Sequence, residues 1–271
     1  MDLTRSVLDC LVKRAQAGDR PALEELVRAI QDPVHHLAVR MLVDPGEALM
    51  ATEAILVRIV GELSTFSSDR PFIIWVLAVA SAYLLSAPSG LAREQGITFE
   101  VFEDRLLAAL DDDNVAGPED ALALSELRIV CSMALLLCLD RLHRLAYVLG
   151  DVLETDDREA AEIMGVSLSS YRDCLSTARE RVVLATCRNC GVVNPDAPCS
   201  CPKRLAQAER SGQVDRSAYA FATRGAPSYA DVLEQTKGTE QFLGVMINQR
   251  AVGPLLSPKD FAANLAEPAR K

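Results

Sequence analysis

Residues 139–182 read LDRLHRLAYVLGDVLETDDREAAEIMGVSLSSYRDCLSTARERV, and this stretch predicts two short helices, a tight turn and a third helix. Asp156 or Asp157 is placed to cap the helix before the turn, because its side-chain oxygen can accept a free backbone N–H. Gly165 ends that helix where a left-handed residue costs least. Ser167 then caps the next helix. This order of elements is typical of a helix-turn-helix.

The helix after the turn has an apolar face and a polar face. Its apolar residues recur at helical spacing and are Tyr171, Leu175, Ala178 and Val182. The opposite face carries the candidate DNA-binding residues Ser169, Ser170, Arg172 and Arg179. Such a helix can enter a DNA major groove. Amphipathic helix pairs also occur in all-α proteins that bind no DNA, and acidic residues outnumber basic ones here, so we expect weak DNA binding by this element alone.

The whole chain has the composition of a globular helical protein. With 271 residues, 49% of them apolar and 24% charged, it is long enough for two small domains and an extension. Its net charge of −10 argues against a generally basic nucleic-acid-binding or anionic-membrane surface. The N-terminus alternates charged and apolar residues, which fits neither a signal peptide nor a transit peptide. We therefore expect a cytoplasmic protein.

Residues 71–85, PFIIWVLAVASAYLL, form an almost wholly apolar run. The run is shorter than the roughly 20 residues that span a bilayer, and it ends at Ser86 and Pro88. It therefore predicts a helix buried on most sides rather than a membrane span. Asp69 is the expected cap of this helix, with Pro71 in its first turn.

Helix start signals and changes of composition divide the chain. Asp19 with Pro21, and then Asp44 with Pro45, are typical helix starts. No alternation typical of strands competes with the helical patterns, so we predict an all-α fold. The four expected segments are a first helical domain (5–87), a linker with one amphipathic piece (88–118), a helix-turn-helix domain (119–185) and a cysteine-containing, loosely helical extension (186–271).

Four cysteines lie close together in the pattern C-x2-C-x8-C-x-C, and they are Cys187, Cys190, Cys199 and Cys201. Four thiolates at this spacing can surround one tetrahedral ion such as zinc. The second pair has one intervening residue where a standard zinc ribbon has two. A redox-responsive thiol group and a tight structural turn are therefore alternatives. Three further cysteines in apolar helical patterns are predicted to be buried thiols: Cys131, Cys138 and Cys174.

Catalytic motifs are missing from the sequence. It contains no nucleotide-binding glycine loop, nucleophile elbow or metalloprotease motif. His35, His36 and His143 lie in helical segments without a catalytic constellation. We therefore expect a protein that is not an enzyme.

Two parts of the chain resemble a known family. GDRPALEELVRAIQDPVHHLAVRMLVDP (18–45), followed by TEAILVRIVGELSTFSSDRPFIIWVLAVA (52–80), resembles the core-binding and promoter-melting domain, region 2, of extracytoplasmic-function RNA polymerase sigma factors. The helix-turn-helix segment resembles their region 4. LLLCLDRLHRLAYVLGDVLE (135–154) and CGVVNPDAPCSC (190–201) look like a subgroup with a cysteine-containing extension. The resemblance covers about residues 10–201.

This resemblance implies a transcription initiation factor whose partners are RNA polymerase core and promoter DNA, and in addition an anti-sigma or other regulatory protein. It places core-polymerase contacts at Glu47, Thr52 and Glu53. The segment 66–85 would help to open and hold the minus-10 promoter DNA, and its Trp75 is either a base-stacking or a core aromatic residue. The helix from Ser167 would read the minus-35 element, and the polymerase would supply catalysis.

Three surfaces depart from the family pattern. The core-binding helix reads GEALMATEA where a motif like DAEDATQE is usual, so Leu49 and Met50 replace acidic residues. The melting helix reads WVLAVASA where a run like WLYRIARN is usual. The recognition helix has Asp173, Cys174 and Thr177 where basic residues are common, and losing phosphate contacts lowers DNA affinity by orders of magnitude.

These departures support a second hypothesis. In it, the chain is a sigma-like regulator that binds RNA polymerase or another sigma factor without opening promoters. A third hypothesis is that the extension senses a metal, an oxidant or a protein and controls the helix-turn-helix.

Overall fold

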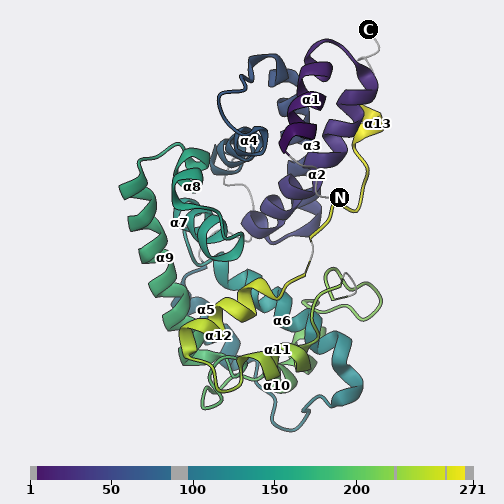
Figure 1. The fold of residues 1–271 in the computed structure, drawn as a ribbon. Coiled ribbons are helices and arrows are strands. Elements are labelled where there is room, and N and C mark those ends of the chain that lie inside the picture. The colour runs from purple at the N-terminus through teal and green to yellow at the C-terminus, as the bar shows by residue number, and fades with distance from the viewer. Residues whose placement is uncertain (1–4, 87–96, 223–224, 254, 266–271) are drawn as a thin grey trace. The chain divides into compact units, whose positions relative to one another are not determined.

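The computed structural model describes residues 5–86, 97–222, 225–253 and 255–265. All regular secondary structure in these ranges is helical (Figure 1). The all-α prediction is therefore confirmed. Within the same ranges, strand-like pairing is confined to one backbone bridge between Cys190 and Cys199. The chain forms two compact units. The first consists of Met1–Ala87, Asp156–Tyr171 and Leu255–Lys271, and the second of Pro88–Thr155 and Arg172–Pro254.

The first unit consists of six α-helices and one 3-10 turn in the described residues, and α2 is the longest of them. They are α1 (Arg5–Gln16), α2 (Arg20–Leu42), α3 (Pro45–Glu62), the 3-10 turn η1 (Leu63–Thr65), α4 (Phe72–Ser86), α8 (Asp157–Met164) and α13 (Ala262–Leu265). The predicted starts of α2 and α3 are confirmed. Asp19 Oδ1 accepts a hydrogen bond from Ala22 N at 3.2 Å, and Asp44 Oδ1 accepts from Glu47 N at 3.0 Å.

Helix α4 is the buried helix that the apolar run predicts. It packs against α2, α3 and α8, and nine of its side chains are buried. Asp69 is not at its cap position, because α4 begins at Phe72 and the residue before it is Pro71; the Asp69 carboxylate accepts a hydrogen bond from Ser67 Oγ at 2.5 Å. The carbonyl of Pro71 instead accepts from Ile74 N and Trp75 N, at 3.1 and 3.3 Å. Among the helices in the described part of the chain, none combines the length and apolar character needed to cross a membrane.

The second unit is organised around α6. Its elements are α5 (Phe99–Ala108), the 3-10 turn η2 (Pro118–Asp120), α6 (Ala121–Leu136), α7 (Arg141–Tyr147), the π-helical turn η3 (Val148–Val152), α9 (Leu168–Asn189) from Arg172 onward, α10 (Cys201–Arg210), α11 (Tyr229–Thr236) and α12 (Gln241–Arg250). Helix α6 contacts α10, α11 and α12. Its residues Ala123, Leu124 and Leu127 share one core with Val192, Leu205, Ala208, Val214, Val232 and Ala251.

These two units differ from the four predicted segments. Most of the extension belongs to the core of the second unit, since α6 is apolar on several sides and needs helices against each of them. The described part of the predicted linker also forms backbone hydrogen bonds to α10 of this unit. Asp111 N donates to Lys203 O at 2.8 Å, and Ala116 N donates to Pro202 O at 3.0 Å. Residues 87–96, where the predicted linker begins, lie outside the described residues.

Candidate DNA-binding and protein-binding sites

The turn between α8 and α9 has the local geometry that the sequence predicts. Asp156 Oδ1 accepts a hydrogen bond from Arg158 N at 2.9 Å, so Asp156 caps α8. Gly165 has a φ of 65°, in the left-handed region, and its N–H donates back to the last turn of α8. Ser167 Oγ accepts from Ser170 N at 3.1 Å at the start of α9. The predicted caps and the predicted helix stop are thus confirmed.

The two predicted faces of α9 are present as well. Its apolar face is buried and consists of Tyr171, Leu175, Ala178 and Val182. Ser169, Ser170 and Arg172 are exposed. The hydroxyls of Ser169 and Ser170 lie 3.0 and 2.8 Å from Ser167 Oγ, so the first turn of α9 carries a small hydroxyl cluster followed by Arg172. Serine and arginine side chains can contact both phosphates and base edges of DNA.

Arg179 does not share this exposed position. Its Nε donates to Asp151 Oδ2 at 2.9 Å, and its Nη2 lies 2.5 Å from Asp151 Oδ1. Its guanidinium also lies over the ring of Phe242, 5.7 Å from the ring centre. The role of Arg179 as a DNA contact stays a prediction, and in this structure its guanidinium is engaged by Asp151. Helical spacing directs Arg179 away from the apolar face of α9, but α12 and η3 occupy the space beside it.

Helix α12 is held at η3 by a second arginine. Arg250 Nε donates to the backbone oxygen of Asp151 at 2.7 Å, and its Nη1 lies 2.9 Å from Glu154 Oε1. The sequence analysis did not single out Asp151 or Phe242 as partners of Arg179, nor Arg250 as a residue that contacts η3. Only the fold brings Phe242 and Arg250 of the extension beside η3, and no local pattern identifies them.

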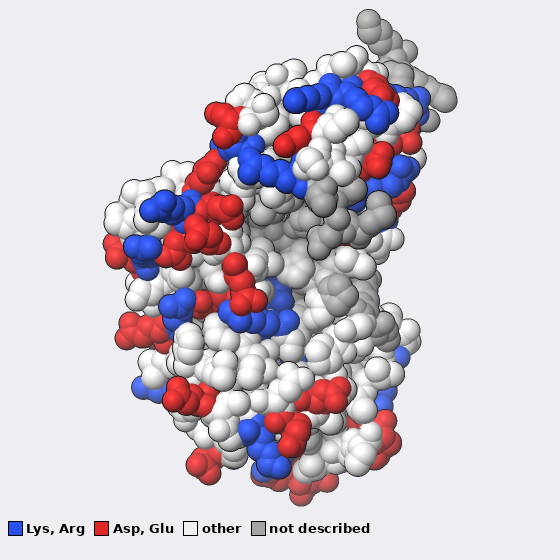
Figure 2. All heavy atoms as spheres, viewed as in Figure 1, with Lys and Arg blue, Asp and Glu red and all other residues white. Residues whose placement is uncertain are grey.

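The helix-turn-helix carries more acidic than basic side chains. Over residues 139–182 there are nine acidic residues, Asp140, Asp151, Glu154, Asp156, Asp157, Glu159, Glu162, Asp173 and Glu180, and six basic ones, Arg141, Arg144, Arg158, Arg172, Arg179 and Arg181. Figure 2 shows basic and acidic side chains interspersed over the visible face of the protein, without a broad basic area. Because DNA affinity depends on phosphate neutralisation, strong DNA binding by this element alone is not expected.

Trp75 has a different environment from a base-stacking aromatic residue. It is 6% exposed and packs with Phe66 and Phe72, with ring centres 5.5 and 5.6 Å away. In this structure Trp75 is therefore part of the core of the first unit. Helix α4 contains no charged residue, and its exposed residues include Ala82 and Ser86.

The three expected core-polymerase contacts have different environments on α3. Thr52 is fully buried, and its Oγ1 donates to Ala48 O at 2.6 Å and lies 3.0 Å from His35 Nδ1. Its role is therefore to join α2 and α3, which corrects the prediction of a surface contact. Glu47 is half-buried in the first turn of α3. Glu53 is exposed, and its carboxylate lies 3.2 Å from Lys259 Nζ.

Lys259 belongs to a tail segment, residues 255–265, that packs on α2 and α3. Phe261 is 1% exposed, and its N–H donates to Gln31 Oε1 at 3.1 Å. Ser257 N donates to Asp32 Oδ1 at 2.9 Å, and Arg28 lies 3.1 Å from Asp260. The sequence analysis did not predict that the tail lies on the face that includes Glu53. A local signal was the pair of apolar residues Leu255 and Phe261, which lie on either side of a polar stretch and are both buried.

The cysteine cluster is only partly assembled. Cys190 and Cys199 are joined by the backbone bridge, and with Cys201 they line one cavity of the second unit. Cys187 does not line this cavity, whereas Cys131 of α6 does. Among the described residues, no group of three or more His, Cys, Asp or Glu side chains is arranged to hold a metal ion. The four predicted thiols thus do not form one tetrahedral set here.

Comparison with known proteins finds no family model that matches this chain and no match among curated proteins.

Proposed function

We propose that this chain is a sigma-type transcription initiation factor that binds RNA polymerase core and recognises promoter DNA. The observation that carries the proposal is the exposed first turn of α9, in which Ser169, Ser170 and Arg172 follow the left-handed turn at Gly165. In helix-turn-helix proteins, the N-terminal residues of the second helix contact base edges in the major groove. The sequence resemblance to sigma factors supports the same assignment.

The acidic character of the chain fits a division of labour with the polymerase. A net charge of −10 and an acidic helix-turn-helix are unfavourable for independent binding to DNA. Attachment to polymerase raises the local concentration of the promoter, so a weak reader can still select a sequence. The chain supplies recognition, and the polymerase supplies the chemistry of RNA synthesis.

The test is transcription in vitro by core polymerase with and without the purified full chain, on a genomic template library. The proposal expects start sites that depend on the chain. Stable polymerase binding without any such start site would contradict it.

A pair of arginine variants tests the recognition helix itself. Arg172→Ala removes one contact at the first turn of α9 and is expected to lower promoter-specific transcription about tenfold. Arg181→Ala removes the same charge from an exposed position nearer the end of α9. This variant is expected to change promoter-specific transcription less than twofold. Equal losses in both variants would mean that only general charge matters.

A second candidate is a sigma-like protein that binds polymerase or another sigma factor without opening promoters. Two observations favour it: Trp75 lies in the core, and Arg179 is engaged by Asp151. The two functions differ in the state of the DNA. Permanganate modifies unpaired thymines, so reactive thymines in a complex of polymerase, chain and promoter support the initiation factor. Polymerase binding that leaves every thymine unreactive supports the second candidate.

A further inference from the structure

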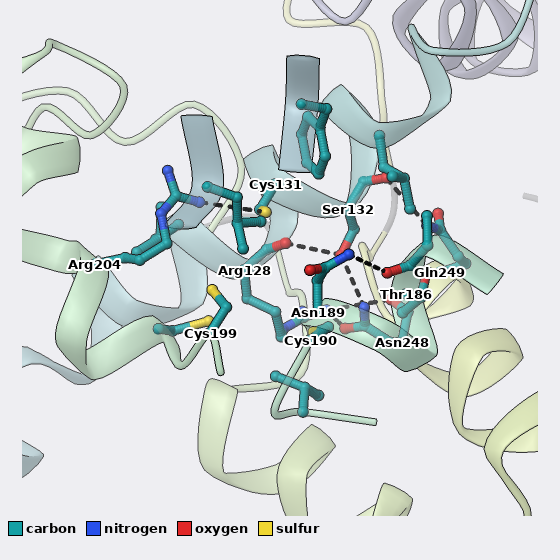
Figure 3. A pocket seen from close by; sticks show the side chains of 17 residues that line it. Arg128, Cys131, Ser132, Thr186, Asn189, Cys190, Cys199, Arg204, Asn248 and Gln249 are labelled. Atoms are coloured by element: carbon teal, nitrogen blue, oxygen red, sulfur yellow. Dashed lines mark hydrogen bonds between the residues drawn. The ribbon is translucent and has the colours of Figure 1, made fainter. Parts of the chain in front are cut away.

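The second unit contains a small cavity with an unusual charge. Its volume is about 40 Å³, and it is lined by residues of α5, α6, α9, α10, α12 and the loop after α9 (Figure 3). Two arginines, Arg128 and Arg204, are among these residues, whereas no aspartate or glutamate of the described ranges lines the cavity. The remaining lining is apolar side chains, thiols, hydroxyls and amides.

Arg128 of α6 is buried, and its hydrogen-bond partners in the described part of the chain are all neutral. It is 1% exposed, and its Nη1 donates to the backbone and side-chain oxygens of Asn248, both at 3.3 Å. Its Nη2 donates to Pro227 O at 3.4 Å and to Ala251 O. Its Nε is buried and has no hydrogen-bond partner in the described residues. Burial lowers the pKa of Arg128 to about 10, so the side chain remains protonated at neutral pH.

Arg204 of α10 is likewise a buried arginine whose partners in the described residues are neutral. It is 7% exposed, its Nη1 donates to Cys131 Sγ at 3.6 Å, and its Nη2 donates to Gln213 Oε1 at 3.2 Å. Its Nε is also buried without a partner in the described part of the chain. Figure 3 shows Arg204 beside Cys131, and Arg128 beside Asn248, on the wall of the same cavity.

A buried cation that lacks an opposite charge is strongly unfavourable. The neighbouring thiols do not supply that charge at neutral pH. Burial raises the pKa of Cys190 to about 11 and that of Cys199 to about 12, and it raises the pKa of Cys201 as well. The two guanidinium groups are therefore left with neutral oxygen and sulfur partners among the described residues.

We propose that this cavity binds a small oxyanion of the size and charge of phosphate or sulfate, with the unpartnered Nε–H groups of Arg128 and Arg204 as donors. The planar guanidinium group suits oxyanions because it presents N–H donors in a fixed geometry. A buried water needs about 10–15 Å³ of such space, so the cavity holds about three waters or one small anion and excludes a nucleotide. The anion would stabilise the packing of α10 and α12 on α6.

The experiment measures thermal unfolding of the full chain in inorganic phosphate, sulfate or chloride, against gluconate at matched ionic strength. Calorimetric titration with phosphate gives the affinity. A ligand that binds only the folded state raises its stability in proportion to the logarithm of ligand concentration above Kd. Phosphate and sulfate are expected to raise the Tm, and chloride is expected to have less effect. No increase in phosphate, or an equal increase in chloride, would overturn the proposal.

Matched variants locate the site. Arg204→Gln is expected to weaken phosphate binding about tenfold or more, because it removes charge-assisted hydrogen bonds. Arg128→Gln is expected to do the same, and if that variant fails to fold, Arg204→Gln alone decides. The control is Arg210→Gln, since Arg210 lies on the same helix with a side chain that is 56% exposed. The same phosphate affinity in Arg204→Gln and in the unaltered chain would overturn the proposal.

Discussion

Arg179 of α9 and Asp151 of η3 form a two-pronged ion pair, with Nε and Nη2 at 2.9 and 2.5 Å from the two carboxylate oxygens. Asp151 is 4% exposed, and Phe242 of α12 covers the guanidinium of Arg179. The pair therefore joins three elements that lie far apart in the sequence. We therefore expect Arg179 to stabilise the second unit.

Replacing Arg179 with alanine should destabilise the protein, because it leaves the Asp151 carboxylate buried without its partner. Solvent reaches part of the Arg179 side chain, so we expect a loss of about 2 kcal/mol in the free energy of unfolding, below the value for a fully buried pair. Urea denaturation of the full chain measures it. Arg181→Ala, an exposed arginine on the same helix, should change this free energy by less than about 0.5 kcal/mol. Similar losses in both variants would contradict a structural role for the pair.

Stability should fall as the pH is lowered below neutrality, with His36 as one cause. Burial, together with the nearby charges of Arg40 and His35, lowers the pKa of His36 from 6.5 to about 4. Below pH 6.5 the unfolded chain therefore takes up a proton that the folded chain does not accept until about pH 4. The contribution of neutral His36 to the free energy of unfolding is fully present above pH 6.5 and is lost as the pH falls toward 4. Between pH 7 and pH 5 this loss amounts to about 2 kcal/mol.

Urea denaturation of the unaltered chain and of His36→Gln at these two pH values tests this prediction. The variant lacks the titrating group, so its stability should depend less on pH by that amount. The same pH dependence in both proteins would assign the effect to other groups.

The docking of the tail should depend on Phe261. Truncating this buried ring in Phe261→Ala is expected to weaken docking by about 3 kcal/mol, the lower end of the cost for a core phenylalanine. The backbone N–H groups of residues 257 and 261 donate to side chains of α2, so hydrogen exchange at these amides should become about 100-fold faster. Leu256→Ala is the control, because Leu256 is 52% exposed. Unchanged exchange in Phe261→Ala would show that the ring does not hold the tail.

The cysteines should differ in reactivity according to their burial. Cys10 is exposed, whereas Cys199 is buried and its pKa is raised to about 12. At neutral pH the thiolate fraction of Cys199 is therefore very small, and the thiolate is the reactive form. Alkylation by iodoacetamide, followed by peptide mass spectrometry, should label Cys10 first and Cys199 only on unfolding. Equal labelling rates in the folded chain would contradict this order and would favour a redox-responsive Cys199.

Local signals in the sequence predicted the helix-turn-helix well. Asp156, Gly165 and Ser167 act through hydrogen bonds to backbone groups within a few residues, so their effect can be read from neighbours in the chain. The buried face of α9 follows from helical periodicity in the same way. The roles of Trp75 and Thr52 were not predictable, because an aromatic ring or a hydroxyl in an apolar helix fits both a core and a binding surface.

Long-range pairs account for most of what the sequence did not predict. Glu53 and Lys259 are 206 residues apart, and Arg128 and Asn248 are 120 residues apart. Neither pair has a local pattern that identifies its partner. The same holds for Cys131, which lines the cavity with Cys190 and Cys199 in place of the predicted Cys187.

The sequence by itself determined the all-α class, the starts of α2, α3, α8 and α9, the end of α8 at Gly165 and the apolar face of α9. These properties depend on backbone capping and on a periodicity of 3.6 residues, which act over one or two turns. The tertiary structure alone decided which helices share a core, that Asp151 engages Arg179, that the tail packs on α3 beside Glu53, and that two arginines line one cavity. Those outcomes depend on which apolar faces bury one another, and several helices of this chain offer apolar faces that fit more than one neighbour.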